Sequence, residues 1–153
     1  MTYSWNWTVL WSQPYLGWLV DGVIATVLIS MIAWVLALSV GTLVAVGNTW
    51  NGTWPRRLGT AYVTLFRNVP LLVQMFIWYF VVPELLPQEI GRWIKRDLPH
   101  PEFWTAVLSL GFYTASRVGE QVRAGIQTIT EGQRQAALAS GLTEWQSYRH
   151  LLL

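Results

Sequence analysis

The sequence predicts an all-α integral membrane protein, and three observations favour that fold class. Charged residues make up 12% of the 153 residues, whereas soluble domains carry roughly 25%. Hydrophobic residues make up 53%, and no charged residue occurs from Gly22 to Pro55. The chain also contains 11 tryptophans, which suits helices that meet two membrane interfaces. We therefore expect long apolar helices that cross a bilayer.

The first 19 residues are polar and aromatic, which is typical of a segment lying at headgroup depth. A loosely ordered tail is the alternative. The first predicted span covers residues 20–46, because about 20 apolar residues cross the hydrocarbon core. Small residues recur every four positions in this span and would let another helix pack closely. They are Ala33, Ala37, Gly41 and Ala45.

The second predicted span covers residues 58–82. Pro70 lacks an amide hydrogen and is expected to bend this helix. Arg67 lies close enough to the interface for its guanidinium group to reach water. Residues 83–102 follow as a periplasmic connecting segment with four prolines and mixed charges, in which residues 89–97 are expected to form a short surface helix.

The third predicted span covers residues 103–129 and contains a second stripe of small residues, Gly111, Ala115 and Gly119. A charged side chain inside a bilayer costs roughly 2.5–3.5 kcal/mol, so Arg117 should face protein or a wet cavity. Several polar residues share its face at helical spacings of three and four. That face consists of Thr114, Arg117, Glu120, Gln121 and Ala124.

The last stretch, residues 131–153, predicts two short helices on the cytoplasmic side. Gly141 can take the positive φ that ends the first helix. Thr143 is a good N-cap for the second helix, and Gln146 three positions later completes a capping-box pattern. Alanines on the first helix would let another surface approach closely. A plain amphipathic helix on the bilayer surface is the alternative.

This stretch resembles the EAA loop of the permease subunits of ABC importers. The family pattern is Glu-Ala-Ala, three residues, Gly, nine residues, Ile, one residue and Leu. Here residues 135–137 read Gln-Ala-Ala, Gly141 fills the glycine place, and Leu151 and Leu153 fill the last two places. The loop would couple the permease to an ATPase. The resemblance places Gln135, Ala136, Ala137 and Gly141 at this contact. Leu138, Leu142 and Trp145 are our candidates for its buried apolar side chains.

Two further segments resemble the permeases of polar amino acid importers. Residues 66–74 read Phe-Arg-Asn-Val-Pro-Leu-Leu-Val-Gln and resemble a segment found in that family. Residues 115–127 are similar to the corresponding segment of the glutamate/aspartate importer permeases. The resemblance covers nearly the whole chain. It implies a type I importer core of five helices. This chain would supply the N-terminal part of that core, namely three transmembrane helices and the EAA-type hairpin.

The resemblance also implies a function and its partners. The chain would be a permease subunit of an amino acid importer, for glutamate or aspartate, that works by alternating access. Its partners would be a cytoplasmic ABC ATPase, a second permease subunit (the same or a paralogue), a periplasmic amino-acid-binding protein and membrane lipid. The expected substrate pathway is lined by Thr114, Arg117, Glu120 and Gln121.

Two interpretations of the charged face remain open from the sequence. In the first, Arg117 pairs with Glu120 or with Asp21 and only holds the helices together. In the second, Arg117 lines the pathway and meets a substrate carboxylate.

The distribution of arginines predicts the orientation in the membrane. Arg56 and Arg57 follow the first span with no acidic residue nearby, which favours a cytoplasmic first loop. Three spans then leave the N-terminus outside. The resemblance implies the same orientation, with residues 1–19 in the periplasm of a bacterial inner membrane and the EAA loop in the cytoplasm.

Other functions are disfavoured by the sequence. Its formal charge of +2 is too small to indicate a nucleic-acid partner. Lys95 lacks the flanking glycines of a phosphate-binding loop, so ATP hydrolysis is expected on another chain. No cofactor or metal is expected. A membrane enzyme, with His100, His150, Glu120 and Glu131 as candidate residues, and a scaffold or fragment without transport activity remain as alternatives.

Overall fold

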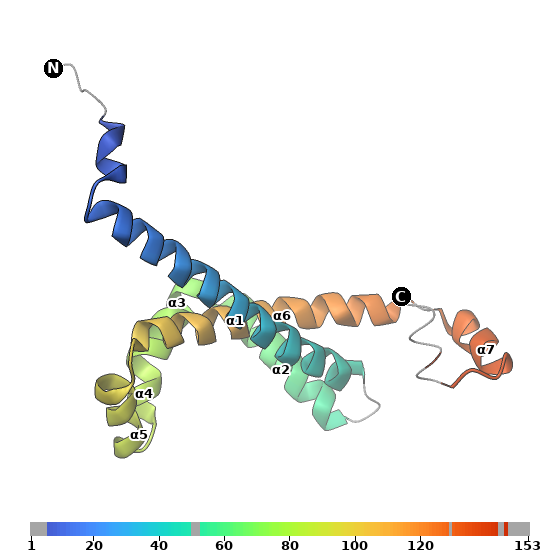
Figure 1. Cartoon of the computed structure of the whole chain (residues 1–153). Helices are drawn as coiled ribbons and strands as arrows, with labels where there is room; N and C mark the ends of the chain where they lie inside the picture. The colour runs from blue at the N-terminus through green and yellow to red at the C-terminus, as the bar shows by residue number, and fades with distance from the viewer. Residues whose placement is uncertain (1–5, 50–52, 129, 144–145, 147–153) are drawn as a thin grey trace.

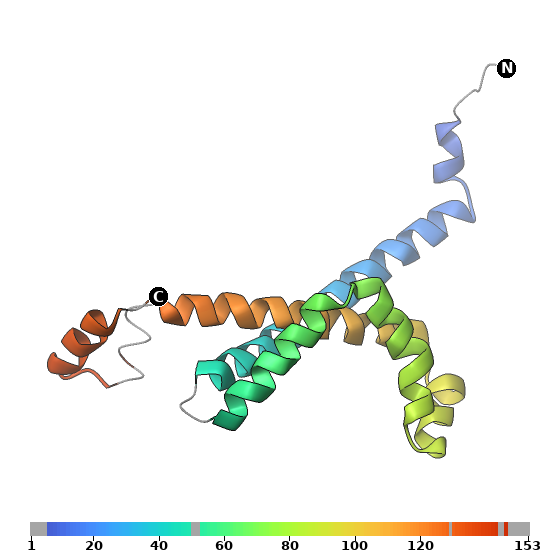
Figure 2. The ribbon, with the colours of Figure 1, turned by 180° about the vertical axis from the view of Figure 1, so that it is seen from behind.

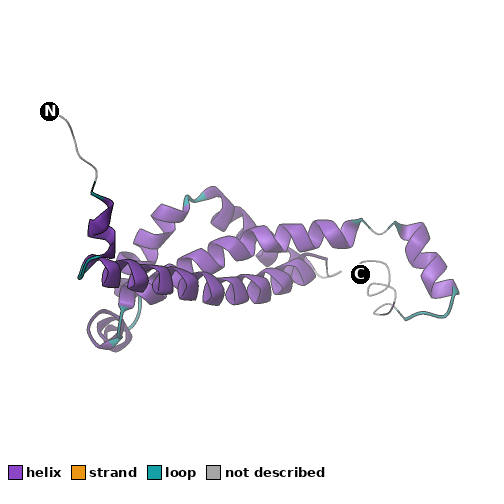
Figure 3. Ribbon diagram, turned by 45° about the horizontal axis from the view of Figure 1, so that its top comes forward, coloured by secondary structure: helices purple, strands orange, loops and turns teal. Residues whose placement is uncertain are grey.

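Every regular element in the described part of the chain is a helix (Figure 3). The computed structural model describes residues 6–49, 53–128, 130–143 and 146. The all-α class is thus confirmed for these residues. In chain order the elements are the 3-10 helix η1 (Trp7–Trp11), α1 (Tyr15–Thr49), α2 (Thr53–Asn68), α3 (Leu71–Phe76), the π-helix η2 (Ile77–Val81), α4 (Val82–Leu85), α5 (Gln88–Arg92), the π-helix η3 (Trp93–Asp97), α6 (Pro101–Gln127) and α7 (Glu131–Ala139).

Helix α1 is long and apolar enough to cross a membrane by itself. Its 35 residues extend about 52 Å at 1.5 Å per residue, beyond the roughly 30 Å of a hydrocarbon core. It also exceeds the predicted span, residues 20–46, at both ends. Asn48, near the end of α1, is helical and packs on α2. A Cβ added to Gly59 of α2 would lie 2.2 Å from the Asn48 Oδ1.

The two stripes of small residues pack against each other where α1 and α6 cross (Figure 1). A Cβ on Gly41 would lie 2.7 Å from the Cβ of Val118, and a Cβ on Gly111 would lie 2.5 Å from Cδ2 of Leu36. The absence of these side chains lets the two backbones approach closely. Since Leu36 meets Gly111 and Gly41 meets Val118, the two helices run in the same direction at the crossing.

The second predicted span is two arms joined at a sharp break (Figure 2). Thr53–Asn68 and Leu71–Leu85 meet at 104° around Pro70, and together they pass the same membrane test as α1. Their shape fits a broken span or a re-entrant loop. The prediction of a bend at Pro70 is correct, but the observed bend is far sharper than the kink that a single proline produces in a continuous helix. The helix also begins at Thr53, five residues before the predicted start, because Pro55 is tolerated in a first helical turn.

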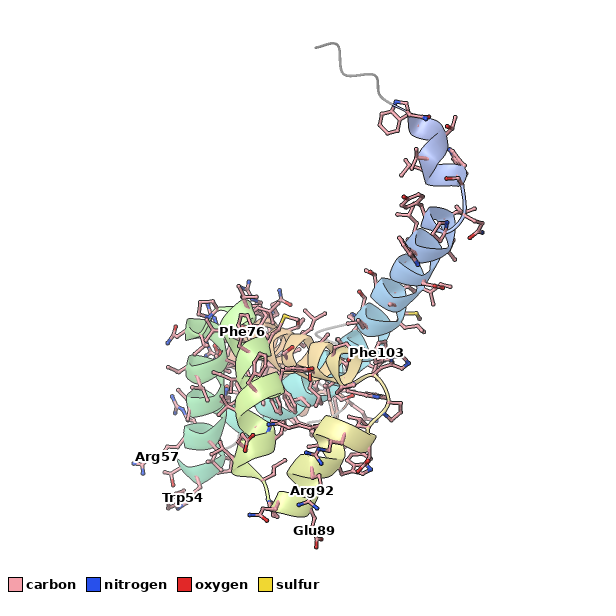
Figure 4. The ribbon with its side chains drawn as sticks, turned by 90° about the vertical axis from the view of Figure 1, so that its left-hand side faces the viewer. Trp54, Arg57, Phe76, Glu89, Arg92 and Phe103 are labelled. Carbon is pink, nitrogen blue, oxygen red and sulfur yellow. The ribbon has the colours of Figure 1, made fainter. Side chains whose placement is uncertain are left out.

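The connecting segment between the second arm and α6 is more helical than predicted. The short helix expected at residues 89–97 is formed by α5 and η3 together. An ion pair between Lys95 and Glu84 ties η3 to α4. Figure 4 shows Trp54 and Arg57 at the outer end of α2, and Glu89 and Arg92 at the outer end of α5.

Candidate functional site

Helix α6 carries the charged residues of the predicted pathway, and its neighbours divide its surface into three faces. Gly111 and Gly119 lie on the face that packs on α1. Phe112 and Glu120 lie on the face that contacts α2. The third face consists of Arg117, Gln121 and Ala124, which are exposed, and Tyr113 and Thr114, which are half-buried.

Arg117 lies on this third face and is held by the tyrosine one turn before it. Its Nη2 donates a hydrogen bond to the Tyr113 Oη at 2.5 Å. Its Cζ also lies 4.9 Å from the centroid of the same ring, within the range of a cation–π interaction. No carboxylate among the described residues forms an ion pair with Arg117. The pairing with Glu120 or Asp21 considered from the sequence is therefore not formed in this part of the chain.

Glu120 has two other arginine partners, which explains why it does not pair with Arg117. Arg123 donates from Nε and Nη2 to its two carboxylate oxygens at 3.1 and 3.0 Å. Arg67, at the end of α2, brings Nη1 within 3.7 Å of Glu120 Oε2. Glu120 thus turns toward α2 and away from Gln121, although the sequence placed both residues on one face. Its geometry is that of a counter-ion that joins two helices.

A tyrosine on α2 provides a further link to α6. The Tyr62 Oη donates to the backbone carbonyl of Phe112 at 2.6 Å. Phe112 also stacks on Trp78 of the second arm, with ring centroids 5.3 Å apart. Sequence analysis did not identify these residues, because the partners lie 50 and 34 positions apart and no local pattern relates them.

Gln74 bridges the break in the bent pair and was also missed from the sequence. The Phe66 carbonyl lacks its usual helical donor, because that donor would be the missing amide hydrogen of Pro70. Gln74 Nε2 donates to this carbonyl and to that of Val69, each at 2.9 Å. A cavity of about 160 Å³ borders Gln74, and apolar residues of both arms line the rest of it: Leu65, Phe66, Val69, Ile77, Trp78 and Val82.

Helix α7 contains most of the predicted coupling residues and has defined caps at both ends. The Thr130 side chain and the Gln133 side chain form a reciprocal capping box at its start. At its end Gly141 has φ of +85°, as predicted. The Gly141 amide donates to the Leu138 carbonyl at 3.0 Å and the Leu142 amide to the Ala137 carbonyl at 3.2 Å, which is the Schellman arrangement.

Beyond Gly141, Thr143 and Gln146 form hydrogen bonds with each other. The Thr143 amide donates to Gln146 Oε1 at 2.9 Å, and the Gln146 amide donates to Thr143 Oγ1 at 3.3 Å, so the predicted capping box is formed. Trp145, Leu151 and Leu153 lie outside the described residues. Figures 1 and 2 both show α7 beyond the end of α6, away from α1 and α2. Within α7, Gln135 and Ala136 are exposed, Ala137 is buried and Leu138 is half-buried.

Among the residues weighed for enzymatic chemistry, the side chains of His100 and Glu120 are described, and these residues lie 20 positions apart, at the N-cap of α6 and within α6. His100 Nδ1 lies 3.6 Å from Glu102 Oε1, and both side chains are largely exposed. His150 lies outside the described residues. The described residues contain no group of three or more His, Cys, Asp or Glu side chains that could hold a metal ion.

Comparison with known proteins now identifies the family. The model of the family described as "Binding-protein-dependent transport system inner membrane component" matches residues 37–153. The chain belongs to this family. Members of it are transport permeases of the inner membrane, and the match runs from the middle of α1 through α6 and α7.

Individual relatives are permeases of amino acid transporters. The chain is 47% identical over 161 residues to the glutamate/aspartate import permease protein GltJ of Escherichia coli K12, covering 100% of this chain and 65% of that protein. It is 33% identical to GltK of E. coli O6:H1, covering 99% of this chain and 65% of that one. The chain thus spans 65% of the length of these two relatives.

A solved structure has the same fold. It is described as "Crystal structure of an amino acid ABC transporter with histidines" and superposes with a TM-score of 0.72 at 24% identity. The match covers 98% of this chain and 63% of that chain. Over the part that the chain spans, its helical arrangement is therefore that of the matched transporter chain.

Proposed function

We propose that this chain is the N-terminal part of the membrane domain of a permease subunit that imports acidic amino acids by ATP-driven alternating access. Its family and its similarity to the permeases GltJ and GltK support transport and the substrate class. The partners would be a cytoplasmic ABC ATPase, a second permease subunit and a periplasmic amino-acid-binding protein. Lipid would cover the exposed apolar side chains of α1, such as Val23 and Leu43.

The observation that carries the substrate class is the unpaired charge of Arg117. Its guanidinium group lies on the face of α6 that α1 and α2 leave open, and it is permanently charged. A carboxylate of glutamate or aspartate would neutralise it and accept a charge-assisted hydrogen bond from it. Thr114 and Gln121 would line the same path. Glu120 would serve as the counter-ion of Arg67 and Arg123 beside it.

Three crossings with a periplasmic N-terminus are the topology we propose. Helices α1 and α6 run in the same direction where they cross, as the first and third spans of such a chain must. The bent pair would complete the second crossing, with residues 83–102 on the periplasmic side. The cytoplasmic side would then hold Arg56, Arg57 and α7.

Helix α7 and the turn after Gly141 would form the coupling element. Its exposed Gln135 and Ala136 would lie against the ATPase, because small side chains allow a groove to approach closely. Leu138 and Leu142 would supply the apolar contacts. Trp145 would join them in the second helix of the hairpin.

The test is transport by the full-length permease in vesicles with its ATPase, second permease subunit and binding protein. We expect ATP-dependent uptake of labelled glutamate and aspartate, with glutamine a poor substrate. Arg117→Gln should lower acidic amino acid uptake about 10- to 150-fold, the value of one lost charge-assisted hydrogen bond. Uptake that prefers neutral or basic amino acids in the wild type would overturn the proposal.

A further inference from the structure

We propose that Tyr113 is a positioning residue for Arg117 and thereby sets the preference of the pathway for anionic substrates. This inference rests on the proposed function and adds a residue to it. Tyr113 does not stand out in the sequence, because a tyrosine in an apolar helix is common and carries no motif.

The geometry of the pair supports this role. Residues 113 and 117 are one turn apart on α6, a spacing at which side chains meet. Tyr113 holds Arg117 in two ways, since its oxygen accepts from Nη2 and its ring faces the guanidinium carbon at 4.9 Å. An arginine side chain loses much rotamer freedom on binding, so prior fixation improves affinity for a ligand.

The hydrogen-bonding capacity of the pair also suits a carboxylate. Arg117 has five N–H donors and Tyr113 accepts from one of its nitrogens, so several donors stay available. Because the tyrosine oxygen acts as the acceptor in this bond, its own O–H can donate elsewhere. The pair thus presents donors to an approaching ligand, which matches the acceptor-only chemistry of a carboxylate.

The neighbouring carboxylate does not compete for this site. Glu120 is bound by Arg123 through two hydrogen bonds and approached by Arg67. It thus leaves Arg117 without a protein counter-ion in the described part of the chain. Tyr113 restrains the cation without neutralising it, which a carboxylate in the same place would do.

The experiment measures uptake by the full-length permease, assembled with its partner subunits in vesicles. Tyr113→Phe keeps the ring and removes only the oxygen. We expect it to raise the KM for glutamate and aspartate about 2- to 10-fold, the value of one net hydrogen bond. The discrimination against glutamine should fall by the same factor. Tyr113→Leu, which also removes the ring face, should have a larger effect.

Tyr62→Phe is the matched control. It also removes a phenol oxygen from a helix contact, the bond to the Phe112 carbonyl, but it lies on α2. We expect it to lower thermal stability and to leave the ratio of glutamate to glutamine uptake unchanged. That ratio separates positioning of the cation from a general loss of packing.

The background of Arg117→Gln separates the two proposals. There, Tyr113→Phe should have no further effect on KM, because no guanidinium remains to be positioned. If Arg117→Gln alters the glutamate-to-glutamine ratio and Tyr113→Phe does not, the inference about Tyr113 is overturned and the role of Arg117 stands. If Arg117→Gln itself leaves the ratio unchanged, the proposed role of Arg117 fails. An equal effect of Tyr113→Phe in both backgrounds would also overturn the inference.

Discussion

Gln74 donates a hydrogen bond to the Phe66 carbonyl across the break at Pro70, with an N–O distance of 2.9 Å. The Gln74 side chain thus supplies the N–H donor that Pro70, which has no amide hydrogen, cannot supply. It therefore joins the two arms of the bent pair at the point where the helix ladder is interrupted.

Gln74→Leu should destabilise the permease by about 1–2 kcal/mol, because the carbonyls of Phe66 and Val69 lose a buried donor. The cost is limited, since the change also removes the buried Gln74 Oε1, which has no partner among the described residues. Thermal unfolding of the detergent-solubilised protein measures this loss of stability. Gln88→Leu, an exposed glutamine in α5, is the control and should change stability by less than about 0.5 kcal/mol. Equal stability of both variants would contradict the bridging role.

Gly41→Ala should disrupt the crossing of α1 and α6. Its Cβ would lie 2.7 Å from the Val118 Cβ and 2.8 Å from the Ala115 carbonyl oxygen, and such overpacking costs about 1–3 kcal/mol. Gly22→Ala in the same helix meets nothing within 4 Å and should be neutral or stabilise by about 0.5–1 kcal/mol. Gly41→Ala should therefore lower the melting temperature, whereas Gly22→Ala should leave it unchanged or raise it. A tolerated Gly41→Ala would mean that the two helices do not pack through their small stripes.

Glu120→Gln should weaken the contact between α2 and α6. It should leave the preference of transport for anionic substrates unchanged. Losing the charged hydrogen bonds to Arg123 and the contact with Arg67 should cost roughly 1.5–3 kcal/mol. The double variant with Arg67→Gln should be less destabilised than the sum of the two single changes, because the same contact is lost in both. Unfolding measured for the three variants tests this. Additive effects would place Glu120 and Arg67 in separate interactions.

Gly141→Asp should uncouple ATP hydrolysis from transport. The residue has φ of +85°, where a side chain costs about 1 kcal/mol, and the carboxylate would enter the proposed ATPase contact. Gly132→Asp, in the first turn of α7, is the control, because a negative charge is favourable at a helix N-terminus. ATPase stimulation by loaded binding protein in vesicles is the measurement. Normal stimulation in Gly141→Asp would show that this turn is not the coupling element.

The proposed orientation can be tested by single cysteines, because the chain has no native cysteine. An impermeant thiol reagent should label Gln88→Cys in intact spheroplasts and leave Thr53→Cys unlabelled until the membrane is opened. Both side chains are exposed in the structure, so access to the reagent depends on the side of the membrane. Labelling of Thr53→Cys in intact cells would mean that the orientation is the reverse of the one proposed.

The local features of this protein were readable from its sequence because each depends on residues within a few positions of one another. The extent of α6 matches its prediction within two residues at each end. The break at Pro70, the positive φ of Gly141 and the capping box at Thr143 follow from proline geometry, glycine freedom and side-chain reach over three residues. The stripes of small residues showed that close helix packing would occur.

The tertiary structure alone decided which groups meet. The two stripes pack on each other, and Glu120 binds Arg67, which lies 53 positions before it. Arginine side chains are long and can reach several carboxylates at helical spacing, so the sequence left the partner of Arg117 open. At the 104° break of the bent pair, Gln74 reaches back to Phe66, and Trp78 stacks on Phe112 of α6. Such contacts join residues distant in sequence, and they form only when the helices have already been brought together.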